Sequence, residues 1–160
     1  MDNYELVSII GGGSFGQVYL AKHKVEGKHY ALKKIKICDL SEKGRENTDN
    51  EIKLLQSFKH INIVGHKESF VDNEQLLNIV MTYCEGGDIY DKIRDANGKY
   101  FSEDQILDWF TQILLALHYL HEKRILHRDL KAQNIFLREG KVRLRNEVRF
   151  VWVTLVFQRF

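Results

Sequence analysis

The stretch from His127 to Asn134 concentrates side chains that can carry out chemistry, because Asp129, Lys131 and Asn134 fall within eight residues. A carboxylate can accept the proton of an attacking hydroxyl, a lysine can neutralise a phosphoryl group in transit, and an amide oxygen can help to hold Mg²⁺. The set therefore suits phosphoryl transfer. A charged turn between two short strands is the alternative for this stretch taken alone.

A glycine-rich segment precedes it near the N-terminus, with Gly11, Gly13 and Gly16 between two β-prone runs, 4–10 and 17–20. Glycines let backbone N–H groups approach phosphates without interference from a Cβ atom. A G-x-G-x-x-G pattern also occurs in dinucleotide-binding proteins, but there a helix follows. A strand is predicted to follow here, which leaves a phosphate-binding loop and a simple hairpin turn as the alternatives.

A third strand is predicted over residues 29–37, and it contains three lysines. Alternation along a strand places Lys33 on the face opposite Leu32. We expect Lys34 and Lys36 to be ordinary solvated side chains, whereas Lys33 is the candidate for contact with phosphates.

A helix capped by Ser41 is predicted to run to Ser57, and it carries Glu51 in its later turns. Glu51 is either an ion-pair partner for Lys33 or an exposed glutamate on a charged helix, which is the more common fate of a single glutamate.

Further elements follow in the order strand, strand, helix, helix and hairpin. Two strands are predicted at 65–71 and 75–83, a helix at 89–95 and a longer one behind the capping box that begins at Ser102. Apolar residues recur along this longer helix at helical spacing and predict its core face: Ile106, Phe110, Ile113, Leu114, Leu117 and Leu120. Trp109, His118 and His121 are expected to be packing or surface residues rather than ligands. A hairpin is predicted to pair 135–137 with 142–144.

The composition is that of a globular domain, with 160 residues, 44% apolar residues and a net charge of +2. This charge gives no reason to expect nucleic acid as a partner. Cys38 and Cys84 form no CxxC pair, which favours a reducing compartment and a cytoplasmic location. No apolar run is long enough to suggest a membrane segment, and the N-terminal residues do not resemble a signal peptide.

Together these motifs resemble those of eukaryotic protein kinases. Residues 127–134 match the catalytic-loop pattern H-R-D-L-x-x-x-N, and residues 11–18 match G-x-G-x-x-G-x-V. Residues 30–33, Tyr-Ala-Leu-Lys, are similar to the V-A-I-K motif. Within the family, residues 83–88 and 126–137 resemble the NIMA-related serine/threonine kinases, and the resemblance extends from residue 1 to about 144.

The resemblance implies an α+β, protein-kinase-like fold. It divides the chain into a five-stranded antiparallel N-lobe with helix C (1–83), the beginning of a helical C-lobe (84–144) and a divergent tail (145–160). It also implies ATP as a substrate and Mg²⁺ as a cofactor, with a protein serine or threonine as acceptor. Association with the cytoskeleton or cilia is suggested by the family only, and the oligomeric state stays open.

The resemblance also assigns roles to individual residues. Asp129 is the expected base, Lys131 favours serine or threonine over tyrosine, and Asn134 is the expected ligand of magnesium. Met81 corresponds to the gatekeeper, and Asp88 to a ribose contact. The full set implied for ATP binding comprises Ile10, Gly11, Gly13, Gly16, Val18, Ala31, Lys33, Glu51, Met81, Cys84, Asp88 and Phe136. For Cys84 we favour a small, buried apolar role over a reactive one.

The kinase pattern stops after Leu144. A D-F-G motif is expected there, but the sequence reads Arg145-Asn146-Glu147, and no A-P-E follows. We therefore expect a kinase chain truncated after the catalytic loop, inactive by itself, and with part of the cover of its long helix lost. The β-prone run 150–157 is a candidate strand that patches the exposed core. A catalytically dead module that binds a nucleotide or a partner is the alternative function, and a chain that does not fold stably is the third reading.

Overall fold

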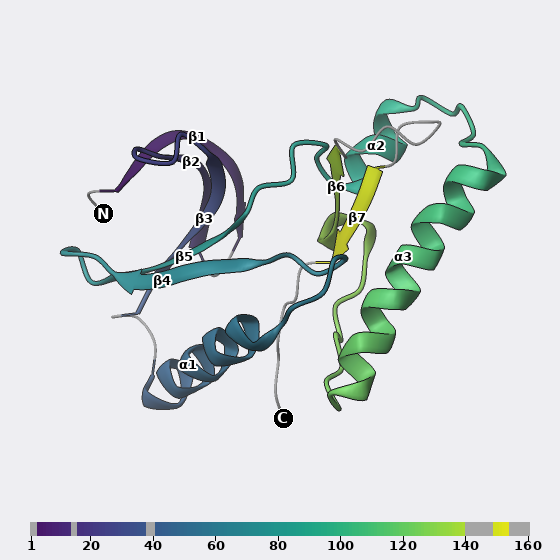
Figure 1. Cartoon of the computed structure of the whole chain (residues 1–160). Helices are drawn as coiled ribbons and strands as arrows, with labels where there is room; N and C mark the ends of the chain where they lie inside the picture. Colours follow the sequence, from purple (N-terminus) through teal and green to yellow (C-terminus); the bar gives the residue numbers. More distant parts are fainter. Residues whose placement is uncertain (1–2, 14–15, 38–40, 140–148, 154–160) are drawn as a thin grey trace. The chain divides into compact units, whose positions relative to one another are not determined.

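The computed structural model describes residues 3–13, 16–37, 41–139 and 149–153 (Figure 1). The chain forms two compact units. The first contains Met1–Phe58 and Gly65–Tyr83, and the second contains Lys59–Val64 and Cys84–Phe160. Residues 59–64, which the sequence analysis placed in the N-lobe, thus group with the second unit.

The first unit is built on a five-stranded antiparallel sheet with the strand order β1-β2-β3-β5-β4. The strands are β1 (Tyr4–Gly13), β2 (Gly16–His23), β3 (His29–Lys36), β4 (His66–Val71) and β5 (Leu76–Thr82). This sheet confirms the predicted fold class. One helix, α1 (Glu42–Ser57), follows β3 and lies on the β4 side of the sheet (Figure 1). Its first turn is capped by the Ser41 hydroxyl, which accepts a hydrogen bond from the Gly44 N–H.

Strand alternation separates the two faces of this sheet. Leu32 pairs directly with Tyr19 and Val80 on neighbouring strands, so their side chains share one face. Leu32 and Val80 are fully buried there, with Tyr4 and Ala21 in the same apolar cluster. Lys33 lies on the other face, as alternation predicted.

Lys34 differs from the prediction, because its side chain is largely buried and forms an ion pair with Asp72 at 3.4 Å. The Asp72 carboxylate also accepts hydrogen bonds from the Glu74 and Leu76 N–H groups and from the Asn78 amide. One carboxylate therefore fixes the β4–β5 turn and neutralises Lys34. Burial acts to raise the pKa of Asp72, but the bonds from Asn78, Leu76 and Lys34 outweigh it and lower the pKa. The expectation of a solvated side chain holds for Lys36, which is exposed.

The second unit contains two helices and a two-stranded sheet. They are α2 (Ile89–Asp95), α3 (Glu103–Glu122), β6 (Ile135–Glu139) and β7 (Arg149–Val153), with a short 3₁₀ helix at Ala132–Asn134. Caps explain where the helices begin, since Asp88 accepts from the Asp91 N–H and Ser102 accepts from the Gln105 N–H. The core joins Ile89, Trp109, Ile135 and Leu137.

Residues 59–64 are held to α3 by polar contacts. The buried Asn62 amide donates a hydrogen bond to the Gln112 side chain at 2.9 Å. The Lys59 N–H donates to the Tyr119 hydroxyl at 3.0 Å, and the His60 ring lies 5.0 Å from the Tyr119 ring. These long-range contacts explain why the segment packs with the second unit despite its position in the sequence.

The core face of α3 was predicted wrongly in part. Ile106, Phe110 and Leu114 are exposed, whereas the buried residues of the helix are Trp109, Gln112, Ala116 and Leu120. Apolar residues occur nearly all round this helix, so the spacing alone could not select the face that meets β6.

The described partner of β6 is β7, with Ile135 opposite Val153 and Glu139 opposite Arg149. The predicted partner, 142–144, lies outside the described residues. A strand was expected in the 150–157 run, and β7 supplies it from Arg149 to Val153. No helix in the described part of the chain is long and apolar enough to cross a membrane.

Candidate active site

The face of the first sheet opposite Leu32 gathers four of the residues expected to bind ATP. Val18 pairs directly with Lys33, and Ala31 pairs directly with Met81. Because Ala31 and Lys33 are two residues apart on β3, all four side chains share this face. All four are half-buried, and Gly11 pairs with Val18 at the β1 edge of the group. The face offers an apolar surface next to one cation.

Gly16 fixes the geometry where the glycine-rich segment enters β2. Its φ is +138°, and a Cβ built on it would lie 1.9 Å from the Lys34 carbonyl oxygen. Only glycine fits this backbone position. Gly11 and Gly12 have no such restriction, since a Cβ on Gly12 would meet nothing within 4 Å.

Three other expected ATP-binding residues belong to the same unit. Ile10 is on β1 and exposed. Gly13 ends β1 and pairs with Gly16, but its surroundings are not described. Glu51 lies in α1, and its side chain is outside the described residues, so the predicted ion pair with Lys33 stays a prediction.

The backbone of the catalytic loop forms a tight turn around Arg128. The Asp129 N–H donates to the His127 carbonyl oxygen at 2.9 Å, and Arg128 between them has a φ of +63°. Such a γ-turn is rare and strained for a non-glycine residue, and surrounding contacts must hold it. The buried His127 provides one such contact, because its Nδ1 also accepts a hydrogen bond from the Asp129 N–H at 3.2 Å.

The side chains of Asp129, Lys131 and Asn134 meet at one carboxylate oxygen. The Lys131 ammonium lies 3.0 Å from Asp129 Oδ2, and the Asn134 amide nitrogen donates to the same oxygen at 2.9 Å. Asn134 also donates to the Asp129 carbonyl oxygen at 2.8 Å. Among the described residues, Oδ1 of Asp129 has no hydrogen-bond donor. The carboxylate is therefore held through one oxygen and presents the other.

Lys131 sets the charge of this group. Its hydrogen bond is the main influence and lowers the pKa of Asp129, with smaller contributions in the same direction from Asn134 and His127, while burial acts in the opposite direction. Asp129 is thus ionised at neutral pH, as an acceptor for a hydroxyl proton must be.

Magnesium is compatible with the donors in this loop. Mg²⁺ prefers oxygen ligands and is commonly held by one or two protein groups together with phosphates and water. Asp129 and Asn134 provide a carboxylate and an amide of that kind. The described residues contain no group of three or more His, Cys, Asp or Glu placed to hold a metal ion, so this part of the chain offers only some of the ligands of a coordination sphere.

The residues of the second unit that were expected to bind ATP also have structural roles. Cys84 is buried, and burial raises the pKa of its thiol to about 12, which agrees with an apolar role. Asp88 caps α2 and forms a β-bridge with Phe136. Gly86 donates its N–H to the Leu137 carbonyl oxygen at 2.9 Å, and a Cβ on Gly86 would lie 2.6 Å from that oxygen. Neither this close approach nor the role of His127 was predicted from the sequence, although the Gly86-Gly87 pair was a signal for the close approach.

A family model described as the protein kinase domain matches residues 4–146 of the chain. This chain belongs to the protein kinase family. The match agrees with the antiparallel pairing of β1 and β2, which begins at Gly16, and with the loop that carries Asp129. The family-level predictions are thereby confirmed, while the roles of individual residues stay predictions.

Curated relatives place the similarity among the Nek kinases. The chain is 50% identical over 145 residues to the serine/threonine-protein kinase Nek1 of Mus musculus and 48% identical over 134 residues to Nek4 of the same species. It is 43% identical over 145 residues to Nek3 of Oryza sativa subsp. japonica. The alignments cover 90%, 84% and 90% of this chain but only 12%, 17% and 25% of the relatives. The kinase chain thus spans a quarter or less of their length.

Proposed function

We propose that this chain provides the ATP-binding and phosphoryl-transfer residues of a serine/threonine protein kinase, with Asp129 as the base toward a protein hydroxyl. The observation that supports this most strongly is the arrangement at Asp129. Lys131 and Asn134 hold one carboxylate oxygen, and the second oxygen is left to accept the proton of a serine or threonine. Lys131 also supplies positive charge for the phosphoryl group that moves.

The half-buried face of the first sheet supports nucleotide binding. Val18, Ala31 and Met81 form an apolar surface suited to adenine, and Lys33 on the same face suits the α- and β-phosphates. The glycine-rich segment before β2 suits the phosphates as well, since a glycine N–H group is not shielded by a side chain of its own residue. Ile10, Gly11, Gly13, Glu51, Cys84, Asp88 and Phe136 complete the proposed ATP-binding set.

We assign magnesium to Asn134, together with phosphate oxygens and water. When bound, the ion neutralises charge on the β- and γ-phosphates. The protein residues contribute orientation, because the bonds from the Asn134 amide nitrogen to Asp129 fix the direction of its amide oxygen. A cytoplasmic location is the accompanying proposal, supported by the free, buried thiol of Cys84.

A second candidate function is a nucleotide-binding module that transfers phosphate poorly or not at all. The observation that favours it is the sequence after β6, where Arg145-Asn146-Glu147 stands in place of D-F-G. The aspartate of that motif is a principal metal ligand in kinases, and a neutral Asn146 would not replace its charge.

Two measurements on the purified chain distinguish the candidates: the affinity for a fluorescent ATP analogue, and the transfer of labelled γ-phosphate to a serine- and threonine-containing acceptor protein. Asp129→Asn tests the base, and Asp95→Asn, an exposed carboxylate on α2, is the matched control. A loss of about 10²–10⁴-fold in Asp129→Asn alone supports the kinase proposal. Binding without transfer supports the second candidate. Transfer that survives Asp129→Asn refutes the role of Asp129, and a folded chain that binds no ATP refutes both.

A further inference from the structure

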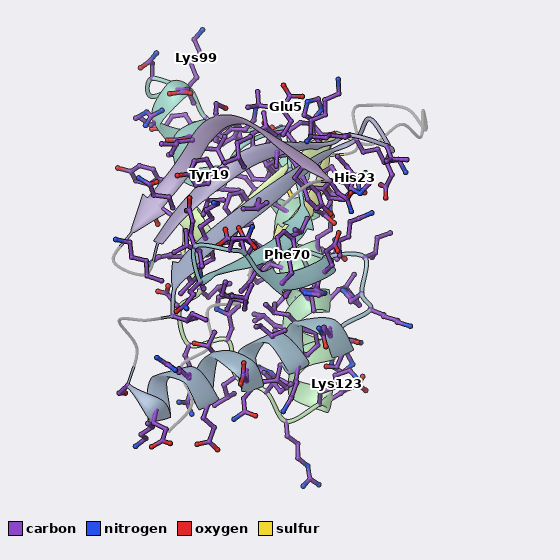
Figure 2. The ribbon with its side chains drawn as sticks, turned by 90° about the vertical axis from the view of Figure 1, so that its left-hand side faces the viewer. Glu5, Tyr19, His23, Phe70, Lys99 and Lys123 are labelled. Carbon is purple, nitrogen blue, oxygen red and sulfur yellow. The ribbon has the colours of Figure 1, made fainter. Side chains whose placement is uncertain are left out.

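The turn between α2 and α3 contains the only Asn-Gly pair in the sequence, Asn97-Gly98. Both residues are exposed and have positive φ angles, +49° and +80°. Lys99, the next residue, points away from the ribbon (Figure 2), and Tyr100 beyond it is fully exposed. No role in nucleotide binding or phosphoryl transfer involves this turn, so its chemistry can be considered by itself.

We propose that Asn97 is a site of spontaneous deamidation in the folded protein. The backbone nitrogen of Gly98 attacks Cγ of Asn97, forming a new N–Cγ bond and a five-membered succinimide. The N–H proton of Gly98 passes to the leaving amide nitrogen, which departs as ammonia. Water then opens the ring at either carbonyl carbon, giving aspartate or isoaspartate at position 97. The sum is hydrolysis of one amide, with no change in oxidation state.

The residue after the asparagine decides whether this reaction is accessible. Glycine has no side chain to hinder attack by its own nitrogen, and it allows the backbone to rotate widely. A Cβ built on Gly98 would meet nothing within 4 Å, so the space on that side of Gly98 is open. Asn78 is the opposite case, because it is fully buried and precedes a β-branched residue, Ile79.

The turn is held by few hydrogen bonds. The Asn97 N–H donates to the Arg94 carbonyl oxygen at 3.2 Å, and the Lys99 N–H donates to the Ala96 carbonyl oxygen at 3.0 Å. Within the described part of the chain, neither the Asn97 carboxamide nor the Gly98 N–H forms a hydrogen bond. The left-handed backbone at Asn97 must rotate before the attack. Breaking these two bonds at the end of a seven-residue helix releases it, without unfolding the core around Ile89.

Each product changes the turn in a defined way. Aspartate at position 97 adds a negative charge near Arg94, which already forms ion pairs with Asp91 and Asp95. Isoaspartate lengthens the main chain by one carbon between α2 and α3 and carries a free α-carboxylate. That carboxylate is the chemical group recognised by S-adenosylmethionine-dependent protein carboxyl methyltransferases that act on isoaspartate. The turn is therefore also a proposed substrate site for this class of enzyme.

Incubation of the purified, folded chain at mildly alkaline pH, followed by peptide mapping with mass spectrometry, tests the proposal. We expect the peptide containing Asn97 to gain the mass of an amide-to-acid exchange at least about tenfold faster than any other asparagine peptide. Transfer of labelled methyl groups by a purified isoaspartyl methyltransferase should appear in parallel. The replacement Asn97→Gln, which keeps the amide but disfavours the five-membered ring, should abolish both signals while leaving the circular dichroism spectrum unchanged.

Other results would overturn the proposal. Deamidation of Asn97 no faster than at the buried Asn78, or detectable only in denatured protein, would show that the fold protects the turn. If Asn97→Gln lowers stability, the comparison among asparagines within the unsubstituted chain still decides the question. Methyl transfer that persists in a folded Asn97→Gln variant would assign the isoaspartate to another residue.

Discussion

Replacing Gly16 by alanine should destabilise the first unit strongly, and the size of the effect follows from two structural features. At a φ of +138°, an L-residue is strained by about 1–3 kcal/mol. The added Cβ would also lie 1.9 Å from the Lys34 carbonyl oxygen, so β2 and β3 must separate locally. Loss of one ladder hydrogen bond adds about 0.5–1.5 kcal/mol. The total is roughly 2–4 kcal/mol of unfolding free energy, a large part of the stability of a typical domain.

Gly12→Ala is the matched control, because the residue lies in the same glycine-rich segment, has no positive φ and has no atom within 4 Å of the position that a Cβ would take. Alanine there should change stability by less than about 1 kcal/mol, and in the stabilising direction if at all. Urea unfolding followed by far-ultraviolet circular dichroism measures both variants, with affinity for the ATP analogue as a second readout. Equal unfolding free energies for the two variants would refute the reasoning, because it attributes the difference between them to φ and crowding at Gly16.

Three further predictions concern buried polar groups. Asp72→Asn should cost about 1–3 kcal/mol at neutral pH in urea unfolding. Since the folded pKa of Asp72 is lowered, its contribution to the unfolding free energy is fully present above pH 3.8, the ordinary pKa, and is lost as the pH falls through the folded pKa. A stability difference between Asp72→Asn and the unsubstituted chain that persists in acid would contradict this. Gln112→Ala should cost about 1–3 kcal/mol because Asn62 loses a buried acceptor, whereas the exposed neighbour Thr111→Ala should be nearly neutral; equal losses would exclude the hydrogen bond as the cause. Cys84, with its thiol pKa raised to about 12, should react with iodoacetamide only after unfolding. Modification of Cys84 in the native protein as fast as in the denatured protein, measured by peptide mapping, would argue against its burial.

Local signals predicted the elements well. Ser41 and Ser102 each accept a hydrogen bond from an N–H three residues later, which is the interaction expected of a helix cap, and α2 has the predicted bounds. The strand prediction also held, because side chains alternate between the two faces of a strand and this places Lys33 on the face opposite Leu32. The types and spacing of residues 127–134, with their resemblance to the kinase pattern, predicted a loop for phosphoryl transfer, and this role stays a prediction.

Non-local contacts account for what the sequence did not predict. Lys34 is buried because Asp72, 38 residues later in the chain, lies beside it in the folded sheet. The face that α3 buries depends on the β6–β7 sheet and on residues 59–64, and the spacing of apolar residues does not reveal it because they occur nearly all round the helix. The γ-turn at Arg128 depends on a buried imidazole, which a motif pattern does not describe. The Lys33–Glu51 pair stays a prediction for another reason, since the Glu51 side chain lies outside the described residues.

The pairing of β6 with β7 has a consequence for which sequences can follow the part of the chain that matches the kinase family model. Strand β7 lies beyond residue 146, where the match to the kinase family model ends, yet it aligns with β6 residue by residue. Main-chain groups form such a ladder, and they are the same in every sequence. A different segment of similar length that avoids proline and carries branched or aromatic residues could therefore form the same main-chain ladder with β6.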